Sequence, residues 1–202
     1  VVSPVTGTTV NRYDLASNLI YTKDSRNVEL TRTFDALNRM TQESSSSDFI
    51  THSIAYDENT SSFGIGRATS IQDQLGSYVF QYERRGLQIG QTTFVDDIGD
   101  LVNGLGLTYT MTQAHDVNGN PVKRVYPSGL IAQTAFDFAD RPASLAALRT
   151  VDAVQETIPI VTAATYAPFG PMTGKTYGNG WVETRAYDQR YFLDDLDVAL
   201  GT

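Results

Sequence analysis

Tyr126-Pro-Ser-Gly129-Leu-Ile-Ala-Gln-Thr-Ala-Phe136-Asp137-Phe-Ala-Asp140-Arg141 is the stretch that decides the fold, because its pattern returns from Tyr177 onward. In the second copy Gly180 takes the place of Gly129, and Tyr187-Asp188 takes the place of Phe136-Asp137. Each copy is a turn, a short run of apolar and Thr, Glu or Arg residues, and a second turn. Glycine favours a turn and the run favours a strand, so the copies predict β-hairpins.

The second turn of this pattern recurs along the chain as an aromatic residue, in most copies followed by Asp, with a turn-forming residue four places after the aromatic in the closest copies. Gly, Asn, Asp and Ser accept the left-handed conformation that such a turn requires. We predict a structural role for these residues, which are Tyr13, Asp14 and Ser17; Phe34, Asp35, Asn38 and Arg39; Tyr56 and Asp57; Tyr82 and Gly86; His115, Asp116 and Gly119; Phe136, Asp137, Asp140 and Arg141; Tyr166 and Gly170; Tyr187 and Asp188.

These turns resemble the YD (tyrosine-aspartate) repeat of the Rhs proteins, the C component of bacterial toxin complexes, and the teneurins. The clearest copies begin at Tyr13, Phe34 and His115, and the resemblance runs from about Asn11 to about Leu193. It implies a strip of antiparallel sheet that spirals into a hollow shell around a toxic or variable C-terminal domain, or that presents an adhesive surface. The family's terminal Asp-Pro motif and its self-cleaving aspartate site do not occur in this chain.

The predicted fold class is therefore all-β, with antiparallel repeat strands joined by tight turns in a spiralling β-sheet strip or partial β-shell. We expect a single YD-repeat domain over residues 1–202. The chain begins at Val1 without Met, so we expect it to be a fragment of a longer repeat shell. The repeat units are placed near residues 11–40, 49–94, 105–142 and 158–193.

Three segments depart from a simple alternation of strands and turns. Residues 42–48 contain four consecutive serines and predict a polar loop. Residues 95–104 interrupt the repeat frame. Residues 143–156 fit either an amphipathic helix or a hairpin turning near Asp152, and the repeat frame favours the hairpin.

Composition limits the classes of partner. The 202 residues carry a formal net charge of −8, which argues against nucleic acid or an anionic membrane as the main partner. Cysteine is absent, which removes disulfides and thiolate sites. No apolar run is long enough for a membrane span. The family resemblance implies a secreted or cell-surface location in a bacterium.

Candidate metal and catalytic groups are few. Residues 116–120 resemble the start of a calcium loop, but Pro121 stands where that loop requires glycine, so a hairpin turn on Asn118-Gly119 is expected. Two acidic groups remain as solvated loop acids, with no metal or cofactor expected: Asp96, Asp97 and Asp100, and Asp194, Asp195 and Asp197. Only His52 and His115 offer a base near neutral pH, so we expect no enzyme activity.

The sequence thus favours a structural segment of an encapsulating shell that contains or presents a toxin or variable cargo. Its expected partners are neighbouring repeat strands of a longer polypeptide, other copies of the chain, a cargo polypeptide or a surface glycan. The alternative is an extracellular carbohydrate- or protein-binding module, for which Trp181 is the candidate glycan-stacking residue. A third alternative is a self-assembling fibrous surface protein.

Overall fold

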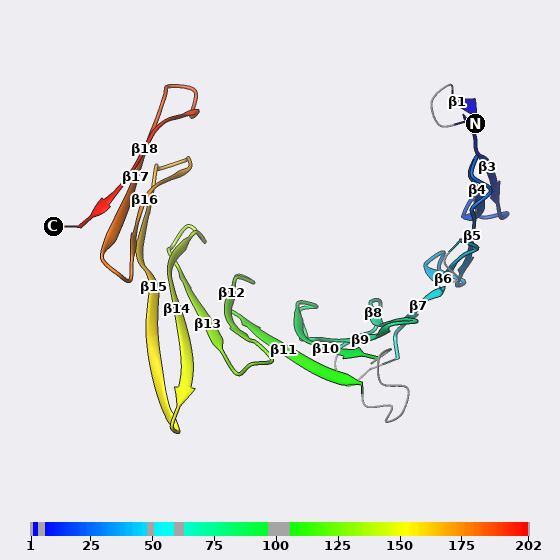
Figure 1. The fold of residues 1–202 in the computed structure, drawn as a ribbon, viewed down its shortest axis with the longest axis horizontal. Coiled ribbons are helices and arrows are strands. Elements are labelled where there is room, and N and C mark those ends of the chain that lie inside the picture. Colours follow the sequence, from blue (N-terminus) through cyan, green and yellow to red (C-terminus); the bar gives the residue numbers. More distant parts are fainter. Residues whose placement is uncertain (1, 4–6, 48–50, 59–62, 97–105, 202) are drawn as a thin grey trace. The chain divides into compact units, whose positions relative to one another are not determined.

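The computed structural model describes residues 2–3, 7–47, 51–58, 63–96 and 106–201, and these form β-strands joined by turns. The backbone divides into two compact units, Val1–Thr110 and Met111–Thr202. Within each unit, successive strands lie side by side in chain order (Figure 1). The all-β prediction with antiparallel strands and tight turns is confirmed. In the described residues no helix is long and apolar enough to cross a membrane.

The first unit contains a two-stranded sheet, β1 and β2, followed by the strands from β3 to the beginning of β11. Strand β11 begins in this unit and ends in the second. The strands are β1 (Val2–Ser3), β2 (Gly7–Thr8), β3 (Val10–Tyr13), β4 (Leu19–Lys23), β5 (Glu29–Phe34), β6 (Met40–Ser45), β7 (Thr51–Tyr56), β8 (Ala68–Asp73), β9 (Gly76–Tyr82), β10 (Gln88–Val95) and β11 (Leu107–His115).

The second unit continues the same alternation of strand and turn. Its strands after β11 are β12 (Pro121–Val125), β13 (Ile131–Phe136), β14 (Pro142–Val151), β15 (Val154–Tyr166), β16 (Met172–Tyr177), β17 (Trp181–Tyr187) and β18 (Leu193–Leu200). The strand order from β3 to β18 follows the sequence, and every pair for which a register is defined is antiparallel. The division into two compact units leaves the single-domain assignment and its repeat boundaries as predictions.

The sheet has almost no buried core. Among the described residues Leu148 is the one buried apolar side chain, at 9% exposure, and the other buried side chains are Thr69 and Glu183. Most remaining strand residues are half-buried or exposed. Within each unit the described strands form one layer, and a sheet without a second layer packed on it buries few side chains. Stability must therefore come from the strand ladder, cross-strand pairs and the turns.

The same register between strands recurs in several repeats. The strand pairs compared are β4–β5, β6–β7, β12–β13 and β16–β17, each of which lies between two consecutive aromatic-acidic turns. In these four pairs the equivalent Cα partners are Tyr21 with Thr31, Gln42 with Ser53, Lys123 with Gln133, and Gly174 with Thr184. Each pair takes the same position relative to the two neighbouring aromatic residues. The sequence repeat is therefore also a repeat of backbone pairing.

Two local predictions have different outcomes. Residues 143–156 form the β14–β15 hairpin, with Asp152 and Ala153 at φ 50° and 64°, so the hairpin is confirmed and the helix is wrong. The polar loop expected over residues 42–48 is wrong for residues 42–45, which belong to β6. Pairing with β5 and β7 supplies the backbone partners, and the Ser44 and Thr51 hydroxyls lie 3.1 Å apart. Sheet pairing outweighs the loop preference of serine.

Candidate functional site: the edge of aromatic-acidic turns

The aromatic-acidic turns share one hydrogen-bonded ring. In seven of the described hairpins, the N–H of the residue after the aromatic donates to the carbonyl four residues later; in an eighth, the Asp57 turn, an insertion makes Arg67 the acceptor. At Phe136-Asp137, the Asp137 N–H donates to the Arg141 carbonyl at 2.9 Å. Alternate hairpins of an antiparallel strip turn at the same edge, so these turns form one edge in each unit. We call it the YD edge.

The acid of the turn holds the loop closed through its own carboxylate. Asp137 Oδ1 accepts the N–H groups of Ala139 and Arg141 at 2.8 and 3.0 Å. Such a side-chain bond two residues on is an Asx turn, which explains why Asp follows the aromatic. The same pair of bonds occurs at Asp14, Asp35, Asp116 and Asp188.

The predicted turn-forming residues mostly take the left-handed conformation that their chemistry allows. Positive φ occurs at Ser17, Asn38, Gly86, Gly119 and Asp140. Gly170 has no positive φ. A Cβ there would lie 2.8 Å from Cε1 of Tyr191, so close packing explains this glycine. Tyr191, which the pattern did not single out, has φ 62° in the Asp188 turn.

A second set of contacts joins the acid to the residue four places later. Asp35 Oδ2 accepts from Arg39 Nε at 2.7 Å, and Asp137 Oδ2 accepts from Arg141 Nε at 2.9 Å. The backbone N–H and guanidinium of the same arginine lower the pKa of each carboxyl below its usual value. Charged Asp is therefore the form that closes these turns.

The same arginines reach forward to the next turn of the YD edge. The Arg39 guanidinium lies 4.2 Å from the centroid of the Tyr56 ring and donates to Asp57 Oδ2 at 2.7 Å. Arg141 lies 4.6 Å from the centroid of the Tyr166 ring and donates to the Ala167 carbonyl at 3.0 Å. Cation–π stacking and hydrogen bonding thus connect consecutive hairpins.

Tyrosine hydroxyls make a third connection, in the opposite direction along the chain. They donate to the backbone carbonyl at the start of a strand in the preceding repeat, at 2.7 to 2.9 Å, in four pairs: Tyr56 to Met40, Tyr82 to Ala68, Tyr166 to Pro142, and Tyr187 to Met172. Phe34, Phe136 and His115 lack this hydroxyl. The sequence pattern identified the aromatic residues but did not predict their hydrogen bonds. The frequent use of Tyr rather than Phe at this position could have indicated them, because only Tyr has a hydroxyl.

The other candidate residues lie apart from one another. His52 Nδ1 is 4.0 Å from Asp73 Oδ2, while the buried Nδ1 of His115 has no hydrogen-bond partner. The described residues contain no group of three or more His, Asp or Glu that could hold a metal ion. Asp194, Asp195 and Asp197 lie in β18 rather than in a loop, which corrects that expectation. Asp97 and Asp100 lie outside the described residues.

Trp181 begins β17 and is the predicted glycan-stacking residue. Trp181 is 43% exposed, and its backbone N–H donates to Asn179 Oδ1 at 3.2 Å. The adjacent turn resembles the turn at Tyr126: Gly180 and Gly129 have φ 89° and 81°. The 126–141 and 177–188 stretches therefore share their turn geometry.

The fold and the YD edge define a single-layer antiparallel β-repeat protein. Three solved structures share this fold at 16% sequence identity. The crystal structure of TcdB2-TccC3 matches with a TM-score of 0.83, covering 98% of this chain and 11% of that chain. The crystal structure of TcdB2-TccC3-Cdc42 and the Photorhabdus luminescens Tc holotoxin pore with a TccC3 mutation each match at 0.82, covering 98% of this chain and 10% of theirs.

This chain therefore spans about a tenth of the length of those structures. At this level of identity the likeness establishes the fold. No protein-family model matches the sequence, and no curated protein matches it either.

Proposed function

We propose that this chain is a structural, non-enzymatic wall segment of an Rhs-like encapsulating shell. The observation that carries the proposal is a single-layer sheet with one buried apolar side chain among its described residues, linked from turn to turn along the YD edge. The repeated pairing of such a sheet extends a surface, which is what a wall requires.

The outer strand of the second unit supports continuation of the wall. In β18, all eight residues are exposed, and among the described strands its hydrogen-bonded neighbour is β17 alone. Leu193 is the first residue of β18, just as Met40, Pro142 and Met172 are the first residues of their strands. The backbone carbonyl of each of those three residues accepts a hydrogen bond from a tyrosine hydroxyl of the next repeat. The Leu193 carbonyl therefore offers the same acceptor to the tyrosine hydroxyl of a neighbouring repeat strand.

Containment of a cargo polypeptide is the further part of this proposal. The similar structures are named as complexes of TcdB2 with TccC3, and one is named as a holotoxin pore. Their shared fold supports the assignment of this chain to the wall of a secreted bacterial toxin complex. In that role the sheet separates a cargo from solvent and needs no cofactor.

Hydrogen–deuterium exchange of β18 at low and high protein concentration tests the wall proposal. Edge amides exchange quickly when unpaired and slowly once a neighbouring strand accepts them. We expect β18 to gain protection as concentration rises, while β17 is protected throughout. Equal, fast exchange of β18 at both concentrations would show that this edge does not seek a partner strand.

A second candidate function is glycan binding, which the 43% exposure of Trp181 favours. Aromatic faces stack on the apolar faces of sugar rings, and the Asn179 side chain accepts the Trp181 backbone N–H in the turn before this ring. A glycan array with the wild type, Trp181→Ala and Trp181→Phe tests it. Saturable binding that the alanine variant loses and the phenylalanine variant keeps supports this function, whereas equal signals from wild type and Trp181→Ala exclude it.

A further inference from the structure

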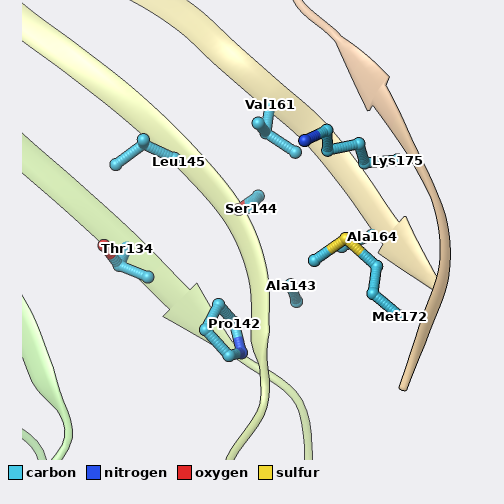
Figure 2. A pocket seen from close by; sticks show the side chains of 9 residues that line it. All are labelled: Thr134, Pro142, Ala143, Ser144, Leu145, Val161, Ala164, Met172 and Lys175. Atoms are coloured by element: carbon cyan, nitrogen blue, oxygen red, sulfur yellow. The ribbon is translucent and has the colours of Figure 1, made fainter. Parts of the chain in front are cut away.

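One face of the second unit carries two adjoining hollows across β12 to β16. The larger, of about 360 Å³, is lined mainly by small and apolar side chains, among them Leu145, Val161 and Met172 (Figure 2). The smaller, of about 250 Å³, shares Thr134 and Leu145 with it. The smaller one is called the Arg124 hollow, and its lining is Pro121, Arg124, Tyr126, Ala132, Thr134 and Leu145.

Arg124 is the charged side chain of this hollow, and it lacks a carboxylate partner among the described residues. Its Nε is buried and has no hydrogen-bond acceptor, while Nη2 makes one long contact of 3.3 Å with Gln113 Oε1. A buried guanidinium N–H without an acceptor is unfavourable, because it has lost water and gained no partner. A carboxylate satisfies a guanidinium best, since its two oxygens match the N–H fork.

The residue opposite Arg124 differs from the residue opposite the equivalent cation in another repeat. Arg124 faces Ala132 across β12 and β13, and Lys175 faces Glu183 at the equivalent positions of β16 and β17. Lys175 Nζ lies 3.2 Å from a Glu183 carboxylate oxygen. Arg32, another half-buried arginine of the sheet, lies 2.6 Å from Glu43. In the Arg124 repeat, Ala132 therefore stands at the position that Glu183 takes opposite Lys175.

We propose that the Arg124 hollow binds a carboxylate of a polypeptide segment, whose neighbouring apolar side chains occupy the larger hollow over Leu145, Val161 and Met172. The Arg124 guanidinium favours a segment with an acidic side chain, and the adjoining apolar surface favours apolar side chains next to that acid in the bound segment. A small free carboxylate offers the same charge but leaves the larger hollow unfilled. The site is independent of the wall proposal, because a sheet without it would still form a wall.

Fluorescence anisotropy with two matched probes tests the site on the full chain. The first probe is a rhodamine-labelled Gly-Leu-Glu-Leu-Val amide, and the second replaces its glutamate by glutamine. We expect saturable binding of the glutamate peptide, with the glutamine peptide about tenfold weaker because the charge-assisted bond is lost. Hexanoate, as the free carboxylate, should displace the probe only at concentrations about tenfold above those of the unlabelled glutamate peptide.

Variants assign the effect to one side chain. Arg124→Gln should weaken the glutamate peptide to the level of the glutamine peptide. Arg149→Gln is the matched control, because it removes a 56%-exposed arginine of the same unit and should leave binding unchanged. If the circular dichroism of Arg124→Gln shows that this variant has lost its β-sheet, two other measurements test the site. These are the difference in affinity between the glutamate and glutamine peptides on the wild type, and the affinity of the glutamate peptide for Arg124→Lys.

Three results would overturn the proposal. Equal binding of the two peptides would show that the carboxylate is not recognised. Unchanged binding by a folded Arg124 variant would place the site elsewhere. Hexanoate competing as well as the peptide would leave a small-anion site and remove the polypeptide from the account.

Discussion

The hydroxyl of Tyr56 lies 2.9 Å from the carbonyl oxygen of Met40, and this bond ties one hairpin to the hairpin before it. Because removing the hydroxyl leaves that carbonyl without its donor, Tyr56→Phe should lower the free energy of unfolding by about 1 kcal/mol. Urea unfolding followed by circular dichroism measures the change.

Tyr109→Phe is the control for this prediction, since Tyr109 is 41% exposed and its hydroxyl makes no hydrogen bond within the described part of the chain. Its unfolding midpoint should equal that of the wild type. Equal midpoints for all three proteins would show that the hydroxyl does not connect the hairpins energetically.

The Asp137 turn separates the role of the carboxylate oxygen from that of its charge. Asp137→Asn keeps Oδ1 as acceptor for the N–H groups of Ala139 and Arg141 but loses the ion pair with Arg141, whereas Asp137→Ala loses both. We therefore expect the alanine variant to unfold at lower urea than the asparagine variant, and both below wild type. The same substitutions at Asp194, in β18, should have little effect. The reverse order at Asp137 would contradict the Asx-turn account.

Glu183 gives the sheet a defined response to acid. The Tyr177 hydroxyl lies 2.7 Å from its Oε2 and, with Arg185 and Lys175, lowers the pKa of Glu183 to about 2 despite burial. In the unfolded chain this carboxyl has its ordinary pKa near 4.5. The ionised form therefore stabilises the folded chain above pH 4.5, and this stabilisation is lost as the pH falls toward 2.

Urea midpoints measured from pH 6 to pH 2 for wild type and Glu183→Gln test this dependence. The advantage of the wild type should be largest above pH 4.5 and should shrink as the pH is lowered. A difference between the two proteins that stays constant over this range would mean that Glu183 does not carry the depressed pKa.

Ser17 tests the backbone requirement of the YD edge. Its φ of 68° costs a residue with a Cβ about 1 to 2 kcal/mol, and the cost is greatest for β-branched side chains. Ser17→Gly should leave the free energy of unfolding unchanged or raise it by up to about 1 kcal/mol, after the entropy of the unfolded glycine is included. Ser17→Val should lower it by at least about 1 kcal/mol. Equal stability of the two variants would exclude a left-handed requirement.

Much of this architecture could be predicted because the turn chemistry is local. The Asp137 carboxylate closes its turn with residues two and four places away, so a short sequence window contains the whole motif. The hairpin at Asp152 followed from the repeat frame even though the apolar spacing of residues 143–156 also fitted a helix.

The remaining features depend on strands that lie far apart in the sequence. The Tyr56 hydroxyl and the Arg39 stack join neighbouring repeats, and no single repeat contains both partners. Serines 44 and 45 are in a strand because β5 and β7 pair with that segment, which composition does not indicate. Arg124 likewise became a candidate site only when register placed Ala132 opposite it.

The molar mass of the 202-residue chain in solution, from light scattering coupled to size exclusion, tests the wall account most directly. We expect assemblies of defined size or filaments, because the edge strand β18 pairs with a strand of another copy. Leu196→Pro in β18 should reduce these assemblies, since proline removes a backbone donor from the edge. A monodisperse monomer of 22.2 kDa at every concentration would contradict it and would favour a self-contained binding module.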